Sequence, residues 1–166
     1  ASYALVDLHG KTIWTGDWPK AEKIHLLPAD AQGRHDLIAI SPQEMFRIDG
    51  RTGRILKRAP LPPVPGGKDR IAPGNSPGTL ADLDGDGSAD TFFLNCGANS
   101  FHLFAVDIDL NLRWHVETPD GQGHSWHLCV CDVNGDGREE VFAGNAVLDH
   151  TGKMLWVQEE VVERLA

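Results

Sequence analysis

The sequence predicts an all-β fold of β-propeller blades, because an acidic loop repeats, a hairpin motif repeats, and helical periodicity is weak almost everywhere. The acidic loop occurs as DLDGDGSAD, residues 82–90, and again as DVNGDGREE, residues 132–140. Short strand-like segments precede and follow each copy, so that each unit contains four strands. Four-stranded units that repeat roughly every 40 to 55 residues are typical of a β-propeller.

The hairpin motif is an apolar residue and an aspartate, followed by a turn and a strand. Its four copies are VDLHGKTIW (6–14), IDGRTGRIL (48–56), VDIDLNLRW (106–114) and LDHTGKMLW (148–156). Glycine in such a turn indicates a β-hairpin, and the turns contain Gly10, Gly53, Leu110 and Gly152 in chain order. The strand after the turn carries, in the same order, Trp14, Lys57, Trp114 and Trp156. We expect the three tryptophans to pack between adjacent blades.

The units follow one another in a single propeller segment that covers residues 1–166. We expect a half blade at 3–18 and complete blades at 24–59, 79–118 and 126–158, with a long Pro- and Gly-rich connection at 60–78. About three and a half antiparallel blades do not close a normal propeller. The segment is therefore expected to belong to a larger propeller or to be completed by other chains or copies.

Oxygen-bearing residues alternate along both acidic loops, as Ca²⁺ ligands do. The first candidate set is Asp82, Asp84, Asp86, the carbonyl of Ser88, and Asp90. The second is Asp132, Asn134, Asp136, the carbonyl of Arg138, and Glu140. Carboxylates this close repel one another unless a cation neutralises them. The sequence therefore predicts two structural Ca²⁺ sites, the alternative being solvated acidic turns without metal.

The two acidic loops are not EF-hands, and a third loop at the corresponding place in another blade is too poor in acidic residues to bind calcium. An EF-hand needs an acidic residue at its twelfth position, where the two loops place Phe93 and Ala143, and its flanks are helices rather than strands. The corresponding loop of the blade at 24–59 keeps only Asp30 and Asp36 of the acidic residues, and we expect it to bind no metal.

Composition excludes some classes of partner. The net charge is −9 and no basic face is evident, so nucleic acid is not expected as a partner. No apolar run is long enough for a membrane span, and no signal peptide is recognisable at Ala1. The three cysteines, Cys96, Cys129 and Cys131, form no disulfide pattern and are expected to be buried thiols.

The acidic-loop segments DLDGDGSADTFFL and DVNGDGREEVFAG resemble the calcium loops of FG-GAP/VCBS-type propeller repeats, and the hairpins resemble blade ends of PQQ-like propellers. The stretch 123–156 is similar to blades of rhamnogalacturonan lyases and related secreted polysaccharide lyases. The resemblance implies a calcium-binding segment of a secreted or extracytoplasmic carbohydrate-active protein. The alternative is a calcium-stabilised binding, adhesion or structural module without chemistry.

The same resemblance implies that substrate binds on the propeller face opposite the calcium loops. On that face the candidate substrate-binding residues are Lys68, Arg70 and Asn99, which could neutralise or hold an acidic sugar. Elimination from a uronate also needs a base, for which the candidates are His124 and His127. A solvated turn histidine and a hydrogen-bonded core histidine are the alternatives for these two residues. Whether the chain is an enzyme stays open at this point, with a polysaccharide lyase as the class if it is one.

Overall fold

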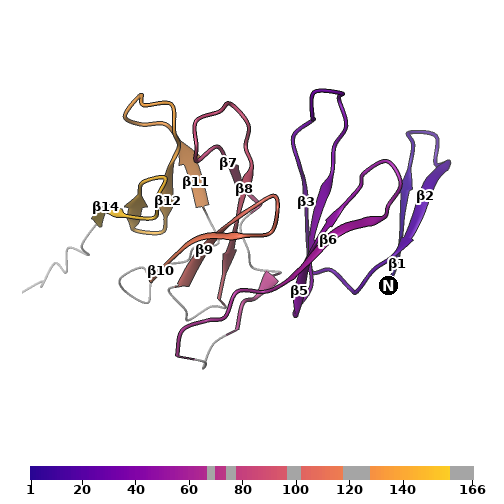
Figure 1. Cartoon of the computed structure of the whole chain (residues 1–166), viewed down its shortest axis with the longest axis horizontal. Coiled ribbons are helices and arrows are strands. Elements are labelled where there is room, and N and C mark those ends of the chain that lie inside the picture. The colour runs from indigo at the N-terminus through magenta and orange to yellow at the C-terminus, as the bar shows by residue number, and fades with distance from the viewer. Residues whose placement is uncertain (67–69, 74–77, 97–101, 118–127, 158–166) are drawn as a thin grey trace, which may run out of the picture.

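The computed structural model describes residues 1–66, 70–73, 78–96, 102–117 and 128–157. Within these residues the chain contains no α-helix and forms four antiparallel sheets (Figure 1). The prediction of an all-β fold built from four-stranded antiparallel blades is confirmed. No helix in the described part is long and apolar enough to cross a membrane.

Each sheet is a meander in which consecutive strands are neighbours. Sheet 1 contains β1 (Ser2–Val6) and β2 (Thr12–Asp17). Sheet 2 contains β3 (Lys23–Leu26), β4 (Leu37–Ile40), β5 (Glu44–Ile48) and β6 (Ile55–Pro60). Sheet 3 contains β7 (Leu80–Ala81), β8 (Thr91–Asn95), β9 (His102–Asp107) and β10 (Leu112–Glu117). Sheet 4 contains β11 (Leu128–Cys131), β12 (Glu140–Ala143), β13 (Ala146–Leu148) and β14 (Met154–Val157).

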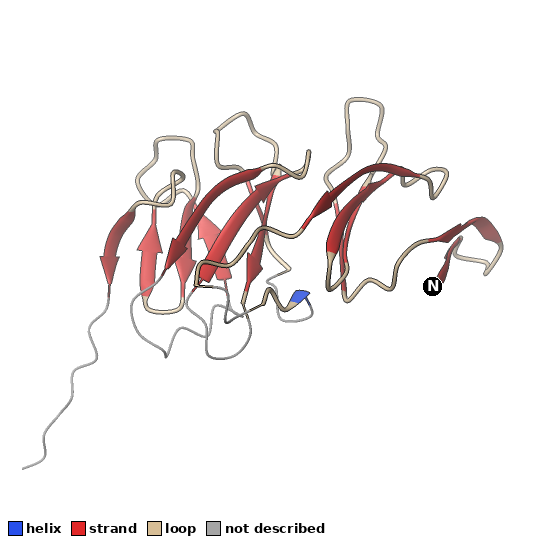
Figure 2. Ribbon diagram, turned by 60° about the horizontal axis from the view of Figure 1, so that its bottom comes forward, coloured by secondary structure: helices blue, strands red, loops and turns tan. Residues whose placement is uncertain are grey.

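The hydrophobic core lies between adjacent sheets, which stand side by side in chain order (Figure 2). Successive strand residues point to opposite faces, so one strand can contribute to two cores. In β8, Phe92 packs with residues of sheet 2 such as Ile38, whereas Phe93 packs with residues of sheet 4 such as Val141. Sheet 3 is therefore buried on both faces, and its inner strands are apolar without alternation.

The repeated aspartate of the hairpin motif closes each hairpin turn. Its carboxylate accepts hydrogen bonds from backbone N–H groups two to four residues later, as in the 2.9 Å bond from Lys11 to Asp7 and the 3.0 Å bond from Lys153 to Asp149. A positive φ is required within the turn, and the residues that adopt it are Gly10 (78°), Gly53 (71°), Leu110 (63°) and Gly152 (82°). Leu110 is the one described non-glycine residue with positive φ, so this turn is kept at some conformational cost.

The cysteines only partly match the expectation of buried thiols. Cys96 is buried, but Cys129 and Cys131 are exposed on β11. Their neighbours Leu128 and Val130 pack toward sheet 3, so the cysteines point to the other face of sheet 4. No further sheet of the described chain covers that face, which is why the prediction of burial was wrong for these two residues.

Candidate metal centre

Backbone amides hold the first aspartate of the loop 82–90 in a fixed position. Asp82 Oδ1 accepts hydrogen bonds from the N–H groups of Gly85 (2.7 Å) and Asp86 (3.3 Å), and Oδ2 accepts one from Gly87 (2.7 Å). The loop can wrap around this carboxylate because both glycines adopt positive φ. One carboxylate oxygen from each of Asp82, Asp84 and Asp86 then lies within 4.8 Å of the others. Three hard oxygen donors at this spacing fit a divalent cation such as Ca²⁺.

The loop 132–140 repeats this arrangement. Asp132 Oδ1 accepts from Gly135 (2.7 Å) and Asp136 (3.2 Å), and Oδ2 accepts from Gly137 (2.9 Å). The hydrogen bond from Gly137 is the largest cause that lowers the pKa of Asp132 below its ordinary value. Asn134 supplies a neutral oxygen where the first loop has Asp84, so the second loop carries less negative charge.

The acidic residues that end the two loops are not structurally equivalent. Across the first loop Ala81 pairs with Thr91, whereas across the second loop Cys131 pairs with Glu140. The second loop is therefore one residue shorter between its paired strand residues than the first. Glu140 is consequently the first residue of β12 and is fully buried. Its carboxylate accepts hydrogen bonds from the backbone of Val133 (3.0 Å) and the side-chain amide of Asn134 (2.9 Å).

Asp90 instead precedes β8 and contacts an arginine. Arg113 donates to Asp90 Oδ2 at 2.5 Å and to Asp84 Oδ2 at 3.3 Å. Burial is the largest cause that raises the pKa of Asp90, despite the opposing influence of Arg113. The sequence interpretation missed this arginine. The sequence did contain a sign of it, because Arg113 is the one charged residue at a hairpin position where the other copies have the apolar residues Ile13, Leu56 and Leu155.

The two acidic loops are joined to each other. The backbone N–H of Asp82 donates to Glu139 Oε2 at 2.7 Å, and the backbone N–H of Glu139 donates to the carbonyl of Asp82 at 3.1 Å. A Cβ atom on Gly85 would lie 2.8 Å from the carbonyl of Gly137, so only glycine fits at this approach. Figure 2 shows both loops at the same edge of the row of sheets. The two loops are therefore in direct contact across the boundary between sheets 3 and 4.

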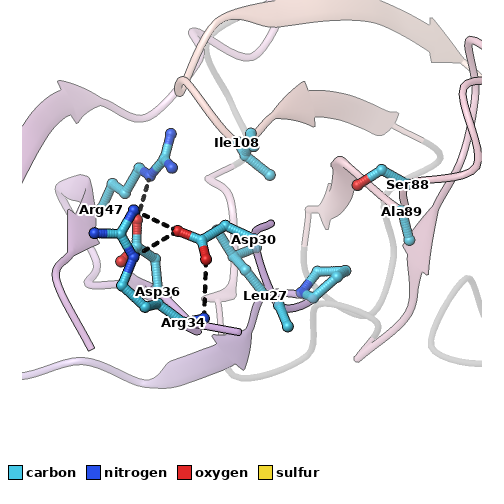
Figure 3. A pocket seen from close by; sticks show the side chains of 10 residues that line it. Leu27, Asp30, Arg34, Asp36, Arg47, Ser88, Ala89 and Ile108 are labelled. Carbon is cyan, nitrogen blue, oxygen red and sulfur yellow. Dashed lines mark hydrogen bonds and ion pairs between the residues drawn. The ribbon is translucent and has the colours of Figure 1, made fainter. Parts of the chain in front are cut away.

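The loop 30–36 of sheet 2 is neutralised by arginine. Asp30 accepts from the backbone of Gln32 (2.8 Å) and Arg34 (2.9 Å), and the Arg34 guanidinium binds its other oxygen at 2.6 Å (Figure 3). This hydrogen bond is the largest cause that lowers the pKa of Asp30 to about 2. Asp36 is bound by Arg47 at 3.0 Å. With both aspartates paired to guanidinium groups, the loop offers no free set of carboxylates to a metal.

A pocket of about 160 Å³ lies between this loop and sheet 3, as Figure 3 shows. Its lining combines Leu27 and Ile108 with the paired charges of Asp30, Arg34 and Arg47. Because each arginine already binds a carboxylate, the pocket has no unpaired cation for an anionic ligand.

The residues predicted for substrate binding and catalysis are mostly outside the described part of the chain. These are Lys68, Asn99, His124 and His127. Arg70 is described and exposed. Its neighbour Ile71 pairs with Cys96, just beyond the end of β8, whereas the loop 82–90 leads into the start of β8. Arg70 therefore lies near the end of sheet 3 that is opposite the acidic loop.

A histidine pair that the sequence interpretation missed lies at this same end of sheet 3. His102 Nδ1 is 2.9 Å from His115 Nε2, across β9 and β10. Burial, followed by the charge of His102, lowers the pKa of His115. Only one proton can lie between the two nitrogen atoms, so one ring donates and the other accepts.

Comparison with known proteins agrees with this architecture. Residues 82–143 match the family model of the FG-GAP-like repeat. No curated protein is detectably similar in sequence to the chain. Among solved structures, the chain is similar to rhamnogalacturonan lyase YesW, with a TM-score of 0.66 and 17% identity over 94% of the chain and 35% of the lyase. The exotype rhamnogalacturonan lyase YesX gives a TM-score of 0.65 and 18% identity over 94% of the chain and 34% of the lyase.

A third similar structure is that of a protein of a different kind. The biofilm matrix protein Bap1 of V. cholerae gives a TM-score of 0.52 and 21% identity over 90% of the chain and 23% of that protein. The chain spans about a third of the length of the two lyases, and identities this low establish the fold alone. The predicted resemblance is thus confirmed as an FG-GAP-like repeat over residues 82–143, within a chain whose fold is similar to that of rhamnogalacturonan lyase β-propellers.

Proposed function

We propose that residues 1–166 form one calcium-stabilised segment of a β-propeller in a secreted carbohydrate-active protein, with one Ca²⁺ in each acidic loop. The observation that carries this proposal is the duplicated cradle around Asp82 and Asp132. In both loops three backbone N–H groups fix the first carboxylate, so the oxygens at the third and fifth positions are held beside it. The loop 30–36 has similar amide contacts without such a cluster, so the feature that distinguishes the acidic loops is the set of oxygens at the third and fifth positions.

The residues that would hold the ions are those predicted from the sequence. They are Asp82, Asp84, Asp86, Ser88 and Asp90 in the first loop, and Asp132, Asn134, Asp136, Arg138 and Glu140 in the second. A bound cation would neutralise the carboxylates and tie the loop to the strands on either side of it. We assign it a structural role.

Calcium titration tests the metal sites. Calorimetry should give two bound Ca²⁺ per chain, and Asp82→Asn or Asp132→Asn should each remove one. Asp30→Asn is the matched control, because Asp30 also accepts backbone N–H groups from the residues after it, namely Gln32 and Arg34, but belongs to the arginine-neutralised loop. The metal proposal is wrong if protein purified in calcium contains no bound divalent ion by elemental analysis.

We further propose that the propeller acts on an acidic polysaccharide by β-elimination. Cationic side chains such as Lys68 and Arg70, with Asn99, would bind and neutralise the uronate carboxylate. His124 or His127 would remove the proton beside that carboxylate. Support comes from the similarity of the fold to rhamnogalacturonan lyases and from the position of Arg70 opposite the acidic loop.

The lyase proposal is tested by the absorbance of unsaturated product during incubation with pectic and other uronate polysaccharides. His124→Ala and His127→Ala should lower turnover without changing calcium content or Tm. Full activity in both variants would remove these histidines from the reaction.

A binding module without chemistry is the second candidate. The similarity of the fold to the biofilm matrix protein Bap1 favours it. In this case no polysaccharide of a broad panel would give unsaturated product, while sedimentation with insoluble polysaccharide would still show binding. The same assay thus separates the two functions.

A further inference from the structure

The strands β9 and β10 bring two histidines and a glutamate together on one face of sheet 3. Across the two strands His115 lies opposite Phe104. Glu117 lies opposite His102, so these side chains project from the same face of the sheet. Phe104 belongs to the core between sheets 2 and 3, whereas Val116, the residue between the histidine and the glutamate of β10, packs toward sheet 4. The shared face is therefore the one toward sheet 2.

The two imidazole rings present nitrogen atoms to each other beside an apolar support. His102 Nδ1 is 2.9 Å from His115 Nε2. The ring of Phe104 lies beside both, with its centroid 6.4 Å from that of His102 and 4.6 Å from that of His115. Phe104 is buried, and both histidines are partly exposed. The rings are thus supported by packing while they stay within reach of solvent.

The separation of the two nitrogens also suits a shared metal ion. Two ligands that each lie about 2.0–2.1 Å from one ion are about 2.9 Å apart at a right angle and about 3.3 Å apart at the tetrahedral angle. A small rotation of the rings would therefore let an ion replace the proton between them. That proton moves to the remote nitrogen of its own ring, so two neutral histidines need release none. Burial lowers the pKa of His115, which keeps this ring neutral and able to bind a cation at neutral pH.

Glu117 offers the third ligand. It is the last residue of β10, it is exposed, and it lies directly opposite His102. In this structure the ligand atoms of these three described residues do not all lie within 4.8 Å of one another, so the Glu117 side chain would turn toward the rings on binding. Two imidazole nitrogens and a carboxylate favour transition metals such as Zn²⁺, whereas Ca²⁺ takes oxygen ligands.

We propose that His102, His115 and Glu117 form a site for a divalent transition-metal ion such as Zn²⁺, at the end of sheet 3 opposite the acidic loops. Three protein ligands leave a coordination position for water or an external ligand. The site uses none of the residues proposed to hold Ca²⁺, and it depends neither on calcium nor on lyase activity. One sheet would thus carry two kinds of ion site at its opposite ends, distinguished by their donor atoms.

Calorimetric titration of the whole chain with Zn²⁺ tests the proposal, in saturating Ca²⁺ so that the acidic loops do not compete. The wild type should bind one Zn²⁺. His102→Gln and His115→Gln should each weaken this binding by about tenfold or more, because one of the two imidazole ligands is lost. Glu117→Gln should weaken it less, since this ligand must turn toward the site. His9→Gln is the matched control, because His9 is exposed in a hairpin turn of sheet 1, and it should bind Zn²⁺ as wild type does. Equal Tm values in calcium show that the variants are folded.

NMR spectra of the histidine rings give a second measurement that needs no variant. Added Zn²⁺ should shift the ring resonances of His102 and His115 and leave those of the buried His25 unchanged. A wild type that binds no Zn²⁺, or unchanged binding in both His102→Gln and His115→Gln, overturns the proposal and leaves the two histidines as a hydrogen-bonded pair. Binding that is lost on joint replacement of His124 and His127 but kept in His102→Gln overturns it as well.

Discussion

The loop 30–36 and the acidic loops 82–90 and 132–140 occupy the same place, between the first and second strands of their sheets, but their charges are balanced differently. All three begin with an aspartate that accepts backbone N–H groups from the residues after it. In the loop 30–36 the fifth residue is Arg34, where the others have Asp86 and Asp136. The guanidinium of Arg34 binds Asp30 directly.

The difference separates two roles of the repeated aspartate. Its first role is to shape the turn, and Asp30 still does this without any metal ligand beside it. Its second role is to contribute a charge to an oxygen cluster, which requires carboxylates or amide oxygens at the third and fifth positions. Replacement of one of these by arginine keeps the turn and supplies the neutralising cation from the chain itself.

The largest expected effect is the response of each loop to calcium. Asp82→Ala should lose the stabilisation that Ca²⁺ gives, about 2.7 kcal/mol at a hundredfold excess of calcium over the dissociation constant. Asp30→Ala should show the same loss of stability with calcium as with EDTA. Urea denaturation of both variants in the two conditions measures this. If Asp30→Ala responded to calcium as Asp82→Ala does, the distinction between the loops would be wrong.

A smaller effect is expected from the link between the two acidic loops. Glu139→Ala leaves the partly buried amide of Asp82 without its charged acceptor, which should cost about 1.5 kcal/mol, the low end for a hydrogen bond to a charged group. It should also weaken calcium binding at the loop 82–90, in the neighbouring sheet, because Asp82 is a proposed ligand there. Calorimetry on this variant, with the exposed Glu22→Ala as control, would show the second effect. Unchanged calcium binding at both loops would mean that they act independently.

Arg113 gives an intermediate case between the two kinds of loop. It binds Asp84 and Asp90 as Arg34 binds Asp30, but it comes from a strand rather than from the loop itself. Arg113→Leu, which introduces the residue found at the aligned Leu56 and Leu155, should lower stability in EDTA by about 1 kcal/mol. The same variant should bind calcium more tightly at the loop 82–90, because a competing cation is removed. Weaker binding in Arg113→Leu would instead make the arginine a support for the site.

The repeat pattern was enough to predict the sheets and the two acidic loops, but not the connections between them. Spacing alone located Asp82 and Asp132, since both follow a strand and precede glycines. It could not show that Asp90 and Glu140 differ by one residue in register, because a single-residue shift after a loop moves a side chain to the opposite face. The contact of Glu139 with Asp82 joins residues 57 positions apart, and no local pattern indicates it.

The exposure of the end faces was equally beyond the sequence. Cys129 and Cys131 lie on an apolar strand, which favours burial, but their side chains point away from sheet 3. Likewise Trp156 has the same sequence context as Trp114, and its exposure follows only from its position in the last described sheet. Repeats determine what a residue packs against only when the neighbouring repeat is known.

The smallest expected effect is the loss of the arginine in the loop 30–36. Arg34 and Asp30 are both partly exposed, with side-chain exposures of 54% and 39%, so Arg34→Ala should change Tm only slightly and less at high salt. The pKa of Asp30 is about 2 in the folded chain, compared with 3.8 as its ordinary value. The pair therefore stabilises the folded chain fully above the ordinary pKa, and its contribution is lost as the pH falls from there toward 2. The difference in Tm between wild type and Arg34→Ala should accordingly be constant at neutral and mildly acidic pH and should shrink below about pH 4. Calcium should leave this difference in Tm unchanged. A difference that depends on calcium would show that Arg34 does not fully take the place of a metal ion in the loop 30–36, contrary to what the contacts of Asp30 indicate.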